Sequence, residues 1–236
     1  MEILKIVSVL GILGLVALAV AAMVRSERRR VAARKQSALR LGFSEVREPE
    51  TQLLERICRL HQKTGDQTIE IANVYQQSGP DYELYLLDVR DHSGDSSDLV
   101  LDGGLAVVSS RLHLPRFTLC PKIVQPGRIA ALANVVLERL ARRAGTEVGF
   151  PTCPEFEARY FVVGPDEAGI RDLFSDRVLS RLSETQHWMI EGEGEFFTFD
   201  RFEFEARRAR TEPAASRHAQ ERVDAALEAL EILARD

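Results

Sequence analysis

The residues that most often carry out catalysis or hold a metal ion are dispersed along this chain. Zinc sites and nucleophilic triads bring His and Cys side chains together, and many zinc sites use short CxxC spacings. No such spacing occurs here, and no GxSxG motif marks a nucleophilic serine. We therefore predict no catalytic, cofactor-binding or metal-binding residue and no cofactor, with reduced cysteines and ordinary histidines. The residues concerned are Cys58, Cys120, Cys153, His61, His92, His113, His187 and His218.

The densest acidic stretch of the chain runs from residue 88 to residue 102. A calcium-binding loop places oxygen ligands at fixed offsets and ends on a bidentate glutamate, and this stretch has neither feature. We expect a solvated hairpin loop, with a weak divalent-cation site as the open alternative. The carboxylates are those of Asp88, Asp91, Asp95, Asp98 and Asp102.

Aromatic residues gather between residues 188 and 204, where Phe202 and Phe204 alternate with glutamates. Alternation with a period of two predicts a half-buried strand. We expect Trp188 and the phenylalanines of this segment to anchor a sheet, and an aromatic ligand-binding groove is the alternative.

The elements around these residues alternate between helical and extended patterns. Apolar spacing and capping residues predict helices over 48–63, 129–145, 166–174, 176–184 and 215–236. Short apolar runs bounded by turn residues predict strands over 68–75, 82–90, 99–110, 114–121 and 158–165, and a hairpin over 187–206. Because strands follow one another through short turns, we predict an α+β class with a mainly antiparallel sheet and flanking helices.

The N-terminus has the pattern of a membrane span. Residues 6–24 carry no charge, and a helix of that length rises about 28 Å, close to the roughly 30 Å of bilayer hydrocarbon. A cleavable signal peptide has a shorter apolar core with its basic segment in front, whereas here the basic segment follows. We predict one uncleaved transmembrane helix over residues 1–24, in contact with the lipid bilayer through residues 6–24. Because positive charge favours the cytoplasmic side, the N-terminus should lie outside and the rest inside.

A basic collar follows the predicted span. Residues 25–40 hold seven Lys/Arg and one Glu, while the whole chain carries −5, so the body of the chain is acidic. An acidic body is untypical of a nucleic-acid-binding domain, and we expect no nucleic-acid partner. We predict a basic juxtamembrane helix over 25–41, capped by Gly42, and a cytoplasmic domain over 42–236. The residues expected to contact anionic lipid headgroups at the membrane surface, or merely to fix topology, are Arg25, Arg28, Arg29, Arg30, Arg34 and Lys35.

Three segments give the chain a resemblance to a known family. They are residues 107–122 with the pattern LPxFxLxP, residues 153–174 with Pro-Glu-Phe ahead of Tyr160 and Gly164, and residues 187–197. Together they resemble a family of uncharacterised bacterial membrane-anchored proteins, with an N-terminal span, an Arg-rich collar and a soluble domain of unknown function. The resemblance implies a location in the bacterial inner (plasma) membrane, and it brings no activity or catalytic residue.

We predict a single-pass membrane protein whose cytoplasmic α+β domain acts as a binding or scaffolding module at the membrane. Its expected partners are anionic lipid headgroups and an unidentified protein, because confinement at a membrane raises the effective concentration of a domain for partners there. The alternative is a membrane-anchored hydrolase with a site built from dispersed His, Asp and Glu residues. A deep pocket that gathers such residues would favour the hydrolase, and a shallow surface with a bare apolar patch would favour the module.

Overall fold

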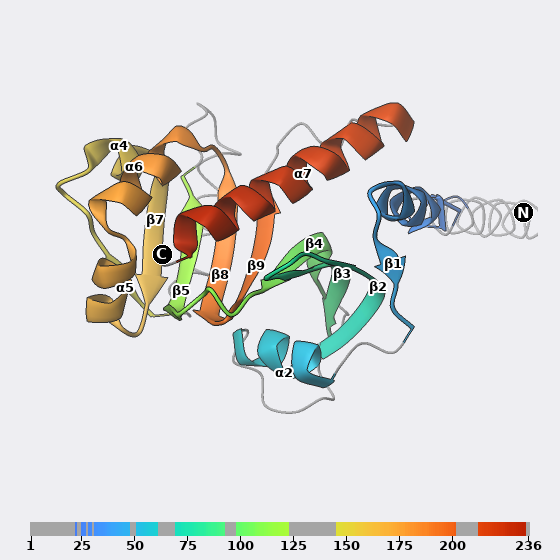
Figure 1. Ribbon diagram of the computed structural model, residues 1–236, viewed down its shortest axis with the longest axis horizontal. Coiled ribbons are helices and arrows are strands. Elements are labelled where there is room, and N and C mark those ends of the chain that lie inside the picture. The colour runs from blue at the N-terminus through green and yellow to red at the C-terminus, as the bar shows by residue number, and fades with distance from the viewer. Residues whose placement is uncertain are drawn as a thin grey trace, which may run out of the picture.

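The computed structural model describes residues 22, 25–26, 28–29, 31–47, 51–60, 69–92, 98–122, 145–201 and 212–234. Within these ranges the strands form one antiparallel sheet (Figure 1). They are β1 (Ser44–Glu45), β2 (Ile69–Ser78), β3 (Glu83–Asp91), β4 (Asp98–Val108), β5 (Leu114–Pro121), β6 (Thr146–Val148), β7 (Tyr160–Gly164), β8 (Trp188–Gly194) and β9 (Phe196–Arg201). Their spatial order is β1-β2-β3-β4-β9-β8-β5-β7-β6, so the β8–β9 hairpin separates β4 from β5.

Helices flank both faces of this sheet. The helices are α2 (Thr51–Leu60), α4 (Pro154–Arg159), α5 (Glu167–Leu173), α6 (Asp176–Glu184) and α7 (Glu212–Leu233). Residues 31–40, which are also helical, are called the neck helix below. The predicted α+β class with a mainly antiparallel sheet and flanking helices is confirmed.

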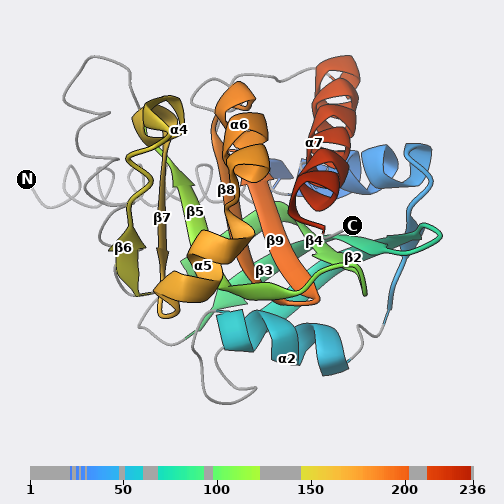
Figure 2. The same ribbon diagram turned by 60° about the vertical axis from the view of Figure 1, so that its left-hand side comes forward.

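The sheet separates two hydrophobic cores, and the alternation along β3 shows how. Leu84 and Leu86 belong to the larger core, whereas Tyr85 and Leu87 belong to the smaller one. The larger core also takes buried side chains from the neck helix, α4, α5, α6 and α7, and the smaller core takes them from α2. Figure 2 shows α6 and α7 on one side of the sheet and α2 on the other.

The neck helix ends in a Schellman motif. Gly42 has φ +84°, the left-handed conformation that glycine adopts at least cost, so the predicted cap is confirmed. The amide of Phe43 donates to the carbonyl of Ala38 at 3.0 Å, and the amide of Gly42 donates to that of Leu39 at 3.2 Å. Ala38 and Phe43 are both buried in the larger core. The end of this helix is therefore packed into the domain.

Several sequence predictions agree with these elements. The strand expected over residues 114–121 is β5, and the expected hairpin is β8–β9. Phe156 and Tyr160 stack with ring centroids 5.7 Å apart where α4 meets β7. Trp188 and the phenylalanines of β9 are buried, which confirms their role as sheet anchors. The helix-to-strand corner expected at Phe156 and Tyr160 is confirmed. Strands β1 and β6 were not predicted, because two or three residues are too few for a periodic pattern.

Some predictions fall on residues that the structure does not describe. They include the helix over 129–145, Phe202, Phe204 and all but Ala22 of the span over 6–24. In the part of the chain that is described, no helix is long and apolar enough to cross a membrane.

Candidate functional site

An open hollow of about 620 Å³ lies where the end of α6 meets β8, β9 and α7. Figure 2 shows the two helices side by side above these strands. The floor comes from Trp188 on β8 and Arg201 on β9. The full lining is Glu184, Thr185, Gln186, Trp188, Arg201, Glu221, Asp224, Ala225 and Glu228.

Four of the nine lining residues are acidic and one is basic, and the helical repeat of α7 brings three of the carboxylates together. Glu221, Asp224 and Glu228 follow one another at spacings of three and four, so they share one face of the helix. Val223 and Leu230 lie on the buried face that packs into the core. Asp224 accepts a hydrogen bond from Gln220 at 2.7 Å, and Glu228 pairs with Arg181 at 3.4 Å. Glu184 adds a fourth carboxylate from α6, so negative charge predominates in the hollow.

A chain of hydrogen bonds holds the floor of the hollow rigid. The amide of Trp188 donates to the hydroxyl oxygen of Tyr160 at 3.3 Å. Since the Thr185 hydroxyl donates to the carbonyl of Leu182 at 2.8 Å, the Tyr160 hydroxyl donates to the Thr185 oxygen, also at 2.8 Å. Burial raises the pKa of Tyr160, so the phenol remains neutral and able to donate. These bonds fix the end of α6 to β7 and β8.

A second polar cluster surrounds Asp88, which is 3% exposed in the middle of β3. Both neighbouring strands carry a β-bulge at this level. Asn73 and Val74 on β2 lie opposite Leu87 alone, and Asp102 and Gly103 on β4 lie opposite Asp88 alone. Asn73 has φ +51° and Gly103 has φ +61°. Bulges redirect polar groups in this way, here toward one carboxylate.

The side chain of Asp88 accepts hydrogen bonds from three elements. Asn73 Nδ2 donates to Oδ2 at 2.7 Å, and the amide of Gly103 donates to Oδ1 at 2.6 Å. The guanidinium of Arg34, on the neck helix, also binds Oδ1. We call Asn73, Asp88 and Gly103 the Asp88 niche. The expectation that Asp88 belongs to a solvated loop is wrong, because its position in β3 points the carboxylate toward the larger core.

Gly103 gives the Arg34 side chain the room it occupies. A Cβ atom at this position would lie 2.7 Å from Arg34 Nε and 2.9 Å from Cζ. Non-bonded carbon atoms normally stay at least 3.5 Å apart, so a side chain here would displace the guanidinium. The niche is thus shaped for Arg34 as well as charged for it.

The residues predicted to contact the membrane surface fall into two groups. Arg25, Arg28 and Arg29 are helical and exposed, and Arg30 lies outside the described residues. Arg34 lies in the niche. Lys35 pairs with Glu45 at 2.7 Å, with both side chains about half exposed.

The histidines and cysteines that the structure describes do not assemble a site. His92 Nε2 lies 3.0 Å from Glu70 on the surface, while His113 and His187 directly precede β5 and β8. Cys58, Cys120 and Cys153, all among the described residues, form no disulfide, and burial raises the pKa of Cys120 to about 12. Among the described residues no three His, Cys, Asp or Glu side chains could hold a metal ion. His61 and Asp95 lie outside those residues.

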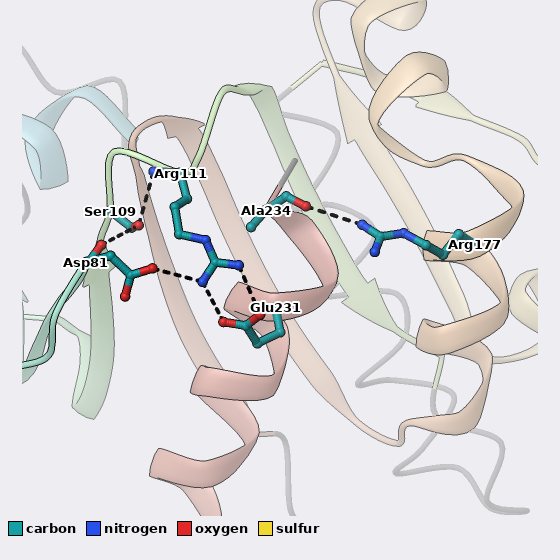
Figure 3. A network of polar contacts seen from close by, with 6 residues as sticks. All are labelled: Asp81, Ser109, Arg111, Arg177, Glu231 and Ala234. Carbon is teal, nitrogen blue, oxygen red and sulfur yellow. Dashed lines mark hydrogen bonds and ion pairs between the residues drawn. The ribbon is translucent and has the colours of Figure 1, made fainter. Parts of the chain in front are cut away.

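A partly exposed network fastens α7, near the other end of the chain, to the sheet (Figure 3). Arg111, which precedes β5, donates to Asp81 at 3.0 Å and to both carboxylate oxygens of Glu231 on α7, at 2.7 and 3.0 Å. The Ser109 hydroxyl accepts from the Arg111 amide and donates to the carbonyl of Asp81. Nearby, Arg177 on α6 donates to the carbonyl of Ala234 at 3.3 Å.

Neither the hollow nor the niche was predicted from the sequence. Their residues come from segments far apart in the chain, and the signal for such contacts is weak. Only the niche leaves a trace, because Asp88 continues the inward alternation of Leu84 and Leu86. A charged residue at an inward strand position indicates a buried polar contact.

Comparison with known proteins finds no match to this chain. No family model matches it, no curated protein matches it, and no solved structure matches it. The resemblance noted in the sequence therefore stays a prediction.

Proposed function

We propose that this chain is a single-pass membrane protein whose cytoplasmic domain binds a positively charged segment of a partner protein in the hollow between α6 and α7. The hollow carries the proposal, because it gathers Glu184, Glu221, Asp224 and Glu228 on one open surface. Complementary charge steers a partner toward such a surface and rejects like-charged competitors. An open hollow admits an extended chain, as a scaffolding module requires.

The composition of the hollow favours a Lys- or Arg-bearing partner. Carboxylates accept hydrogen bonds from ammonium and guanidinium groups, and such bonds are stronger than those between neutral groups. Trp188 adds apolar surface to the floor, and the bonds around Tyr160 and Thr185 hold it in place. A preorganised floor lowers the entropy lost on binding.

The membrane location rests on the N-terminal sequence. The uncharged run over residues 6–24 and the basic collar behind it support an uncleaved span with the domain in the cytoplasm. The exposed arginines Arg25, Arg28 and Arg29 support contact with anionic headgroups. Packing of the neck helix into the core supports a domain held close to that surface.

The chain provides a direct reporter for binding in the hollow. Trp188 is its single tryptophan. The full chain in lipid nanodiscs is titrated with a Lys/Arg-rich peptide, and with a peptide of the same length in which Glu replaces the basic residues. We expect the Trp188 emission to change with the basic peptide alone, and the affinity to fall as salt is added.

Paired variants assign the effect to the hollow. Glu221→Gln with Asp224→Asn removes two lining charges, and we expect affinity to fall by about tenfold or more. Glu147→Gln, an exposed carboxylate on β6, removes one charge elsewhere and should leave affinity unchanged. Equal losses in both variants, or no loss in the first, would contradict a binding site in the hollow.

The orientation has a separate test. Reporters active only in the cytoplasm or only outside it are fused after Asp236. A cytoplasmic signal is expected, and a signal from the outer side would overturn the proposed topology without bearing on the hollow.

A further inference from the structure

We infer that the Asp88 niche is a receptacle for the guanidinium of Arg34, which locks the neck helix to the sheet and thereby sets the height and orientation of the domain. Three adjacent strands are shaped around this one contact. The bulges of β2 and β4 turn the Asn73 amide and the Gly103 N–H toward Asp88. Arg34 is the third donor and binds Oδ1, the oxygen that also accepts from Gly103.

The Asp88 niche has three energetically unfavourable or unusual features that hydrophobic packing alone does not require. Asn73 adopts a positive φ that non-glycine residues rarely take, and such backbone is retained where the surrounding structure demands it. Gly103 leaves no Cβ against the guanidinium. Asp88 is a charged residue in a nearly closed position, which needs a cationic partner. The guanidinium of Arg34 is the partner that accounts for all three features.

The contact lies where it can control the neck helix as a whole. Ser37 and Ala38, which lie three and four residues beyond Arg34, are buried, and Phe43 continues the packing after the Schellman turn. Arg34 adds a polar lock at the other end of this packed stretch. Arg25 and Arg34 are both helical and nine positions apart, and nine residues of helix rise about 14 Å. With the Arg34–Asp88 contact formed, the neck helix holds the domain at a fixed short distance from Arg25. Without the contact, the neck acts as a flexible linker.

The contact between Arg34 and Asp88 also separates the basic residues of the collar into exposed and paired ones. Arg25, Arg28 and Arg29 remain exposed, while the Arg34 side chain is only 18% exposed and is committed to Asp88. The lock itself stands independently of any lipid, and only its use in setting a height above a bilayer rests on the proposed function.

Hydrogen–deuterium exchange of the full chain in detergent tests the lock. Asp88→Asn removes the charge from the niche with little change in shape, and Arg34→Gln removes the guanidinium without altering the sheet. For both variants we expect amides of residues 34–43 to exchange about tenfold faster or more, because local opening becomes easier. Amides of β8 and β9 should keep their wild-type rates.

Lys35→Gln is the matched control, since it removes one positive charge from the same helix but breaks only the exposed pair with Glu45. Its exchange rates should stay within about twofold of wild type. Unchanged rates in Arg34→Gln, or an equal increase in Lys35→Gln, would overturn the lock. If amides of β8 and β9 also exchange faster in Asp88→Asn, the result for Arg34→Gln decides whether the lock exists. Repeating the measurement in nanodiscs separates the two proposals, because failure to insert leaves the detergent result standing.

Discussion

Two arginines fasten the two ends of the described chain to one sheet, and their surroundings differ sharply. Arg34 holds the neck helix through Asp88, with side-chain exposures of 18% and 5%. Arg111 holds α7 through Asp81 and Glu231, with exposures of 32%, 37% and 59%. Both are arginine–carboxylate contacts, yet water competes with only one of them. Burial, rather than the number of ion pairs, therefore decides how much stability is lost when one partner of such a contact is removed.

The cost of losing each contact differs for the same reason. Removing a partner in the niche leaves buried polar groups without their bonds, whereas groups in the Arg111 network regain water. Removing one partner should therefore abolish most of the stabilisation from the Asp88 niche, but only part of that from the Arg111 network.

Asp88→Ala should give the largest effect. It leaves Arg34, Asn73 and the Gly103 amide without their shared acceptor, and we expect a loss of about 3 kcal/mol in the free energy of unfolding. Chemical denaturation of the full chain in detergent measures it. A loss similar to that of Arg111→Ala would show that the two contacts are equivalent.

Gly103→Ala should come next, because it combines a positive φ with a clash against Arg34. Gly194→Ala is a close control, since Gly194 has φ +63° but nothing within 4 Å of the added Cβ. We expect about 1 kcal/mol for the control, from backbone strain alone, and about 2 kcal/mol for Gly103→Ala. Equal losses on denaturation would mean that Arg34 moves aside freely.

Arg111→Ala should destabilise the chain less than either change in the niche. Its partners lie at the surface, where salt screens their attraction. The difference in melting temperature between wild type and Arg111→Ala should therefore shrink as sodium chloride rises, while the Asp88→Ala difference persists. A salt-independent Arg111 effect would contradict the contrast.

The smallest effect is a dependence on pH. The hydrogen bonds from Arg111 lower the pKa of Glu231 below its ordinary 4.5. A lowered folded-state pKa contributes stability above pH 4.5, and this contribution is lost as pH falls through the folded value. The melting temperatures of wild type and Glu231→Gln should therefore differ at pH 6 and converge in acid. A gap that widens in acid would contradict this linkage.

Sequence patterns predicted the parts of the fold that local residues determine. Gly42 ends the neck helix because a left-handed cap needs glycine, and the prolines of β5 bound that strand as expected. The helix expected over residues 176–184 is α6, with Ser175 at its N-cap position, although the serine side chain makes no capping bond. In each case the cause lies within a few neighbouring positions.

The niche and the hollow were beyond such reasoning, because their partners meet only after the sheet forms. Arg34 and Asp88 are 54 positions apart, and the bulge at Asn73 has no glycine to mark it. In the hollow, Trp188 and Glu221 come from different elements. Charged residues are expected at the surface, and only the inward position of Asp88 in the alternation of its strand indicated burial.

The strand order sets the sequence of events during synthesis. Strands β2, β3 and β4 are consecutive in chain and space, so they can pair as soon as they are made. The other edge of β4 pairs with β9, with Val108 opposite Phe196. About 90 residues separate these partners, which corresponds to on the order of 5–20 s of translation. For that interval β4 presents an open edge, and the late β8–β9 hairpin closes the sheet from the middle rather than from its end.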